Sequence, residues 1–218
     1  MIIAEQKELT EIQDMIAPYG KILLVGCGTC MTFCSAGGPG EVDKLTEALV
    51  SEKKDMSVEK SNIPRQCSMK FVERLKDKVG DCQAILSMAC GNGVQAVASR
   101  FPEKPVLPAL NTQFIGIKEE PGIWTEMCMA CGDCILWKTG GICPVTRCAK
   151  SLLNGACGGA SEGKCEVSKD RPCAWQEIYH ALKRLNMLHY LKEKPQVKDW
   201  PIHPGRVVRE DLREGVSP

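Results

Sequence analysis

Short apolar runs alternate with amphipathic segments along the first half of the chain. Four runs predict strands, and the most apolar of them suit strands that are covered on both faces of a sheet. These runs are 21–26, 56–63, 83–89 and 104–110. Four other segments repeat apolar residues every three or four positions, which predicts helices. These segments are 5–17, 40–53, 69–79 and 93–101.

Strands that alternate with helices form a parallel sheet with right-handed crossovers. We therefore expect an α/β fold, with a small Rossmann-like parallel sheet in a domain over residues 1–120. After about residue 120 the pattern changes. Residues 127–173 contain eight of the fourteen cysteines, many glycines and no long periodic run. Apolar burial alone cannot hold such a segment together, so bonds to metal ions or clusters would have to stabilise it.

Apolar positions on one helix face return in residues 174–193. The sequence thus predicts a cysteine-rich, cluster-stabilised domain over 121–193 that ends in a helix. Residues 194–218 are rich in proline and polar residues and are expected to form an extended tail. Four apolar residues in this tail leave open that it is a docking arm for a partner. They are Trp200, Ile202, Val207 and Val208.

Composition and charge narrow the classes of function. The formal net charge of the 218 residues is +1, and no basic stripe is present, so neither nucleic acid nor an acidic membrane is an expected partner. The longest apolar runs are too short to span a bilayer, and the N-terminal segment does not resemble a signal peptide. Motifs of hydrolases and nucleotide-binding loops are absent from the sequence. We expect a cytoplasmic protein.

Fourteen cysteines are far more than a chain of this length usually carries. Disulfides form in oxidising compartments, and the sequence shows no export signal. Thiolate ligation of metal ions or iron–sulfur clusters in a reducing cytoplasm is therefore the favoured interpretation.

Four cysteines of the first half each follow a predicted strand. They are Cys27, Cys30, Cys67 and Cys90. In an open parallel sheet, the loops at the carboxyl ends of the strands gather at one edge, where ligands bind. We expect these four thiolates to converge there and to hold a [4Fe-4S] cluster or a tetrahedral zinc ion.

Other interpretations of this region stay open. Cys34 is a rival ligand, and Cys27 with Cys30 could instead form a redox-active Cys-x-x-Cys pair. A dinucleotide-binding loop is disfavoured, because Met31 stands where its third glycine would be. Cys82 precedes its strand, at the opposite edge of the sheet, and is expected to be a small buried apolar residue.

The cysteine-rich segment begins with a close triplet, Cys128, Cys131 and Cys134. Cys-x2-Cys-x2-Cys spacing wraps one face of a [4Fe-4S] cubane, as in ferredoxins, whereas zinc usually takes two close pairs. Either Cys143 or Cys148 is expected to complete this site, and the sequence does not decide between them.

The remaining cysteines form a second group of four. It contains whichever of Cys143 and Cys148 is left, together with Cys157, Cys165 and Cys173. Twelve cysteines are thus divided into three tetrads, which predicts two or three [4Fe-4S] clusters, with zinc as the alternative in one tetrad. Glycines between these cysteines permit tight turns that bring backbone amides close to sulfur.

Residues 148–175 carry a further pattern. Cys148 is followed by an Asn-Gly-x-Cys-Gly-Gly core at 154–159, a Gly-x-Cys-Glu segment at 163–166 and a Cys-x-Trp before a helix at 173–175. This pattern resembles the C-terminal domain family of methylenetetrahydrofolate reductases, although Ala156 replaces the usual proline. The similarity also extends to the stretches GCGTC, ACGNGVQ and CMACGDC, so it covers most of the chain.

The resemblance implies the small iron–sulfur or zinc subunit that occurs free-standing in anaerobes. Such a subunit is expected to pair with a flavin-containing (FMN or FAD) TIM-barrel subunit that reduces 5,10-methylenetetrahydrofolate to 5-methyltetrahydrofolate. It would accept electrons from a donor subunit or a ferredoxin and pass them to that flavin, and would bind neither flavin nor folate alone. Two alternatives stay open. One is a zinc-stabilised scaffold without a redox role, and the other is an electron carrier for another flavoprotein or a corrinoid system.

Overall fold

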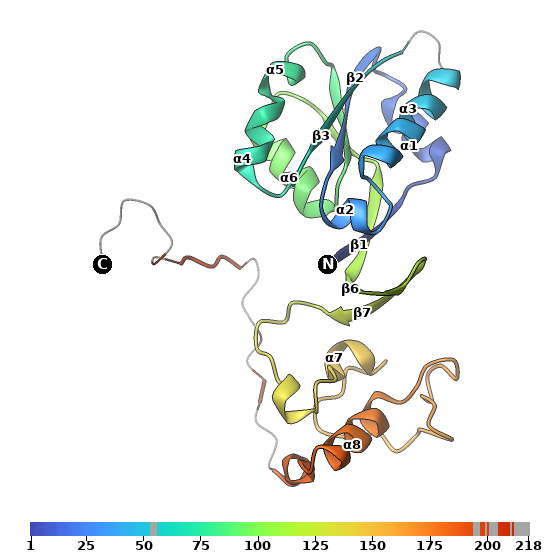
Figure 1. The fold of residues 1–218 in the computed structure, drawn as a ribbon, viewed down its shortest axis with the longest axis vertical. Helices are drawn as coiled ribbons and strands as arrows, with labels where there is room; N and C mark the ends of the chain where they lie inside the picture. Colours follow the sequence, from blue (N-terminus) through green and yellow to red (C-terminus); the bar gives the residue numbers. More distant parts are fainter. Residues whose placement is uncertain (53–55, 194–196, 199, 201–204, 210, 212–218) are drawn as a thin grey trace. The chain divides into compact units, whose positions relative to one another are not determined.

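The computed structural model describes residues 1–218 except 53–55, 194–196, 199, 201–204, 210 and 212–218 (Figure 1). The chain divides into two compact units, Met1–Glu126 and Met127–Pro218, which are described separately here. None of the helices in the described ranges has the length and apolar content needed to span a bilayer.

The first unit contains the predicted parallel sheet. Its four strands, in spatial order, are β3 (Ser57–Ile63), β2 (Lys21–Cys27), β4 (Ala84–Met88) and β5 (Val106–Pro108). Every neighbouring pair is parallel. The α/β fold class expected from the hydrophobic pattern is therefore confirmed.

Helices cover both faces of this sheet (Figure 1). On one face lie α1 (Leu9–Ile16) and α3 (Pro39–Glu52), and on the other lie α4 (Met69–Val72), η1 (Glu73–Leu75), α5 (Lys76–Val79) and α6 (Gly91–Arg100). Alternate residues of β2 explain this arrangement, because Ile22 and Leu24 pack into the core under α1 and α3, while Leu23 and Val25 pack under the other helices. The short helix α2 (Cys30–Phe33) follows β2.

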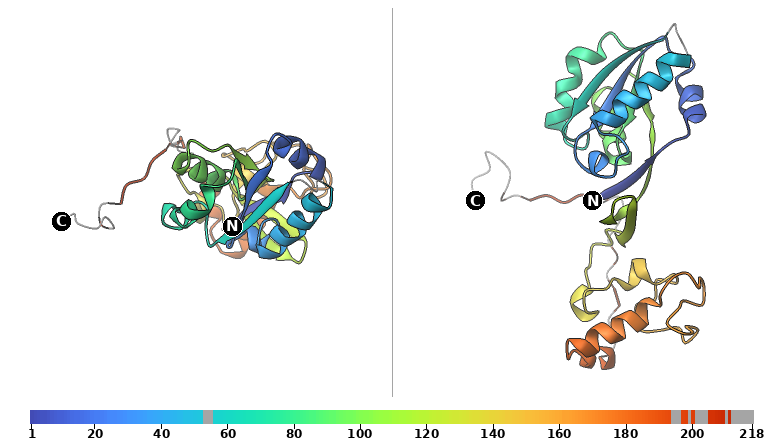
Figure 2. Two further views of the ribbon diagram at one scale, coloured as in Figure 1. Left: turned by 90° about the horizontal axis from the view of Figure 1, so that it is seen from above. Right: turned by 45° about the vertical axis from the view of Figure 1, so that its right-hand side comes forward.

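A second sheet, which the sequence pattern did not predict, belongs to the first unit except for the last two residues of its third strand, Met127 and Cys128. It consists of β1 (Ile2–Gln6), β6 (Leu110–Glu120) and β7 (Ile123–Cys128), in the order β1-β6-β7. The strand β1 runs antiparallel to β6, and the two lie side by side in Figure 2. Most residues of β6 are exposed, so no apolar run or alternation marks this strand in the sequence.

Two helical predictions need correction. The single helix expected over 69–79 is broken into α4, η1 and α5. The helix expected over 174–193 ends at Arg184, and a separate 3-10 turn, η3 (Leu188–Lys192), follows it. Asn186 has φ of +57°, a left-handed conformation that ends α-helices.

The second unit has little regular structure. Besides α8 (Ala174–Arg184) and η3, it contains η2 (Leu136–Lys138) and α7 (Pro144–Arg147). A small core forms where buried α8 side chains meet Cys173, and Trp175 Nε1 donates a hydrogen bond to the Leu152 carbonyl at 2.9 Å. Within the predicted tail, Ile202 lies outside the described residues, whereas Trp200, Val207 and Val208 are exposed.

Candidate thiolate sites

The four cysteines predicted at the strand ends lie at the carboxyl edge of the parallel sheet. Cys27 is the last residue of β2, Cys30 begins α2, Cys67 lies in the loop after β3, and Cys90 precedes α6 directly. Because β2, β3 and β4 run in parallel, the topology places the segments that carry these cysteines at one edge, as the sequence predicted.

Electrostatic contacts show which of these thiols are neighbours. Burial raises the pKa of the Cys27 thiol, while the backbone N–H groups of Gln66 and Thr29 oppose this by donating to its sulfur. The nearby sulfurs of Cys67 and Cys90 raise the same pKa further, so these three thiols share one environment. Bringing them together for ligation would hold them as thiolates and reverse this effect.

Cys30 lies beside the rival ligand Cys34. Burial is the main cause that raises the pKa of the Cys34 thiol, and the charge of Cys30 adds to it. The Cys34 Sγ–H donates to the Met31 carbonyl at 3.7 Å, and the side chain is buried in the same core as Cys27. Either cysteine is therefore close to the edge, and the choice of fourth ligand between them stays open.

Cys82 lies at the opposite edge of the sheet, where it is 1% exposed and packs among apolar residues. Its expected role as a small buried residue is confirmed. We predict that Cys82→Ser leaves the metal content unchanged and lowers the free energy of unfolding by only about 1 kcal/mol, because the hydroxyl can still donate to the Lys78 carbonyl that the thiol contacts at 3.5 Å. Urea denaturation and metal analysis would test this, and a loss of metal would contradict it.

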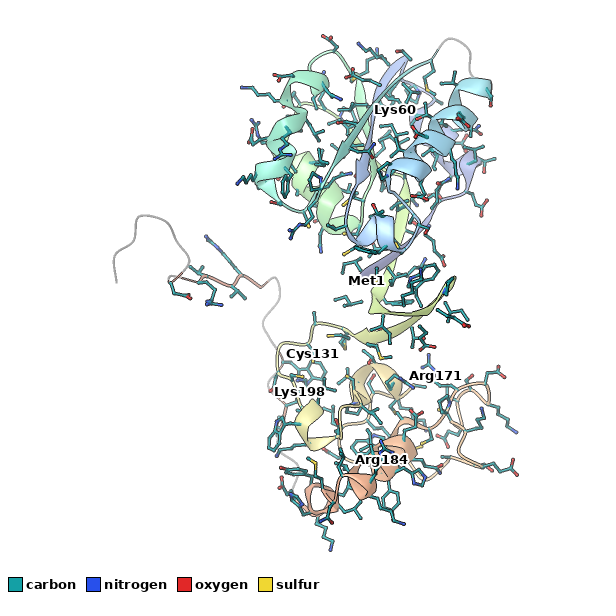
Figure 3. All side chains as sticks on the ribbon, viewed as in Figure 1. Met1, Lys60, Cys131, Arg171, Arg184 and Lys198 are labelled. Atoms are coloured by element: carbon teal, nitrogen blue, oxygen red, sulfur yellow. The ribbon has the colours of Figure 1, made fainter. Side chains whose placement is uncertain are left out.

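The triplet begins with Cys128, the last residue of β7, and continues in the tight loop that follows, where Cys131 is half-buried and Cys134 is exposed. Cys131 is labelled in Figure 3. The intervening residues Ala130 and Gly132 have φ of +56° and +83°, so the chain turns sharply between the cysteines. The Ala130 N–H donates to Cys128 Sγ at 3.3 Å. Backbone amides directed at sulfur in this way stabilise thiolates and cluster sulfurs.

Four cysteines of the second unit line one small cavity of about 20 Å³. They are Cys148, Cys157, Cys165 and Cys173. The structure thus groups Cys148, and not Cys143, with the last three cysteines. Cys143 is the N-cap residue of α7 and Cys148 is its C-cap residue, and only Cys148 of the two lines this cavity.

Backbone amides and cations surround this second tetrad. The Val167 N–H is the main cause that lowers the pKa of the Cys165 thiol, and the Ser168 N–H acts in the same direction. A third N–H, from Ala149, and the positive charge of Arg171 add to the effect (Figure 3). The surroundings of Cys165 therefore favour its thiolate, the form that binds metals.

Two further cations line the same cavity. Arg147 pairs with Glu177 at 3.2 Å, and Lys150 pairs with Glu166. Both cations are thus already paired with carboxylates, and Glu166 lines the cavity beside Lys150. The four cysteines are a donor set that fits a thiolate-bound metal centre. Within the described ranges, no three metal-ligating side chains are close enough together to bind an ion without moving.

None of the fourteen cysteines is in a disulfide. Two polar residues near the strand-end cysteines were not predicted from the sequence. They are Gln66 and Ser87, both 0% exposed. Their only signals are a hydroxyl inside an otherwise apolar strand and a glutamine next to a cysteine.

A second, larger cavity was also not predicted. It has a volume of about 590 Å³ in the second unit, and its walls include Cys134, Trp137, Trp175, Tyr179 and Tyr190.

The fold and the sites define a protein with an α/β unit that carries cysteines at its strand ends and a second unit organised around cysteines. Residues 107–201 match a family described as "Methylene-tetrahydrofolate reductase C terminal". The match confirms the family resemblance over this segment and relates the segment to methylenetetrahydrofolate reductases, a class of oxidoreductase. Comparison with curated proteins and with solved structures gives no match.

Proposed function

We propose that this chain is the small subunit of a methylenetetrahydrofolate reductase and that it relays electrons to the flavin, FMN or FAD, of a TIM-barrel catalytic partner. That partner would reduce 5,10-methylenetetrahydrofolate to 5-methyltetrahydrofolate. The observation that carries the proposal is the family match over residues 107–201, a segment that contains the eight cysteines of both predicted tetrads of the second unit.

The thiolates are assigned to three sites. Cys27, Cys67 and Cys90, with Cys30 as fourth ligand, would hold a [4Fe-4S] cluster at the sheet edge. The triplet Cys128, Cys131 and Cys134 would hold a second one, completed by Cys143, since the structure groups Cys148 with the other tetrad. A bound [4Fe-4S] cluster supplies one-electron transfer.

We assign zinc to the tetrad of Cys148, Cys157, Cys165 and Cys173. Its four cysteines line one cavity, and four thiolates are a common donor set for a structural zinc ion. Nearby backbone N–H groups favour the thiolate of Cys165. In this assignment the tetrad stabilises the second unit and carries no electrons.

The flavin and the folate belong to the partner in this proposal. A TIM barrel needs eight parallel strands, whereas the parallel sheet in the described part of this chain has four. The electrons would come from a donor subunit or a ferredoxin, and the complex would work in the cytoplasm, where thiolates stay reduced.

Anaerobic rapid mixing tests the proposal. The chain is reduced with dithionite, freed of excess reductant and mixed with its flavin-containing partner in the oxidised state. We expect bleaching of the flavin absorbance at a rate that increases with the concentration of this chain. A chain that forms a complex with the partner but takes up no electrons would contradict the relay. That result would favour the alternative function, a zinc-stabilised scaffold, which the four cysteines around one cavity support.

A further inference from the structure

Gln66 is a fully buried polar residue in the loop between β3 and α4, directly before Cys67. Its side-chain amide is 0% exposed, and so is the hydroxyl-bearing side chain of Ser87 in β4. A buried amide is costly unless its donors and acceptor are satisfied, so its hydrogen bonds show what the residue holds together.

The Gln66 side chain bridges two strands. Its Nε2 donates to the Val25 carbonyl of β2 at 2.8 Å, and its Oε1 accepts a hydrogen bond from Ser87 Oγ of β4 at 2.6 Å. Val25 lies two residues before Cys27, and Ser87 lies three residues before Cys90. The amide therefore joins β2 and β4 close to their carboxyl ends, just before Cys27 and Cys90 in the sequence.

A third contact of Gln66 is made with the helix that follows β4, because α6 packs closely on this residue. A Cβ added at Gly93 would lie 2.8 Å from the Cβ of Gln66, so the glycine leaves the space that Gln66 occupies. The loop is thus fixed against β2, β4 and the first turn of α6 at once.

We propose that Gln66 is the positioning residue of the strand-end site. Its amide fixes the loop that carries Cys67 to the ends of β2 and β4, so that Cys67 faces Cys27 and Cys90. This inference rests on the proposed ligand role of these cysteines. It assigns to Gln66 a role in the geometry of the site and not only in the stability of the sheet.

The test measures, residue by residue, how fast iodoacetamide modifies each cysteine of the full-length, anaerobically purified protein. Gln66→Met keeps the length of the side chain but removes both hydrogen bonds, and Ser87→Ala removes one. Val79→Ala is the matched control, because it truncates a buried side chain 2% exposed in α5, on a helix that makes none of these contacts. Cys67 is exposed, so ligation and not burial would protect its thiol, and its modification rate reports ligation of the strand-end site.

We expect Gln66→Met to speed the modification of Cys67 and Cys90 about 10-fold or more, the usual loss when an outer-sphere partner is removed. Ser87→Ala should act in the same direction with a smaller effect, while Cys165 should be modified at the wild-type rate in both. Val79→Ala should leave Cys67 protected even though it lowers the denaturation midpoint.

Two different results would overturn the role of Gln66. Full protection of Cys67 in Gln66→Met, or equal deprotection in Val79→Ala, would show that the glutamine contributes no more than any buried residue. If Cys67 is unprotected in the wild-type protein, the strand-end ligand site is wrong, and the positioning role of Gln66 is wrong with it. The modification rates of the cysteines in the second unit would still test the two sites there.

Discussion

Cys165→Ser is expected to unfold the second unit and to release the metal of its tetrad. Among the described residues of this unit the hydrophobic core cluster is small, with four buried residues at and beside α8 and the partly buried side chains packed on them. Between Cys148 and Cys173 the backbone forms isolated β-bridges, such as that of Ser161 with Lys164, in place of a helix or a continuous sheet. We therefore expect the proposed metal–thiolate bonds to supply most of its stability.

The size of the effect follows from the energetics of structural zinc sites. Binding contributes about 10–16 kcal/mol in small zinc domains, and this energy is also folding energy. Serine is a poor zinc ligand, and the three N–H groups that favour the Cys165 thiolate would lose their charged acceptor. We expect rapid proteolysis of the second unit, loss of one zinc per chain, and a first unit that stays folded.

Limited proteolysis followed by mass spectrometry would measure this, with zinc content determined on the same sample. Cys82→Ser is the matched control, since it makes the same chemical change at a cysteine packed among apolar residues at the far edge of the sheet. A Cys165→Ser protein that retains its zinc and resists protease as well as Cys82→Ser would show that the tetrad does not hold the unit together.

Cys131→Ser is expected to remove one cluster and most of the electron flow to the partner flavin, without unfolding the chain. Cys131 is the central cysteine of the triplet, on an exposed segment whose turns depend on Ala130 and Gly132. Since this segment buries little apolar surface, the loss of its cluster should leave α8 and the zinc tetrad in place.

Iron analysis and the flavin-bleaching assay would measure the result. We expect about four irons per chain fewer than in the wild type, the content of one [4Fe-4S] cluster, together with a large fall in the rate of flavin reduction. The two cysteine variants differ in kind, because Cys165→Ser should cost structure and Cys131→Ser should cost electron transfer. Full iron content and an unchanged rate in Cys131→Ser would contradict the assignment of the triplet.

The parallel sheet could be predicted because its strands are buried on both faces. Ile22, Leu23, Leu24 and Val25 are all 0% exposed, so every position of this run had to be apolar. The sheet of β1, β6 and β7 could not be predicted in the same way. Much of β6 is exposed and is stabilised by pairing with β1, a partner more than a hundred residues away in the sequence.

The placement of the candidate ligands was predictable to the same degree as the topology that carries them. Parallel strands bring Cys27, Cys67 and Cys90 to one edge wherever the intervening helices lie. The grouping of Cys148 with the last three cysteines was not predictable, because it depends on how the chain folds back between α7 and α8. Gln66 was equally hidden, since a buried amide leaves no periodic signal.

The central claim is that the strand-end cysteines and the triplet hold [4Fe-4S] clusters that relay electrons, and metal and sulfide content measures it most directly. Iron, acid-labile sulfide and zinc should be determined per chain on protein purified under strict anaerobiosis. The assignment predicts about eight irons and eight sulfides, the content of two [4Fe-4S] clusters, together with about one zinc. A chain that contains neither iron nor sulfide would contradict the electron relay.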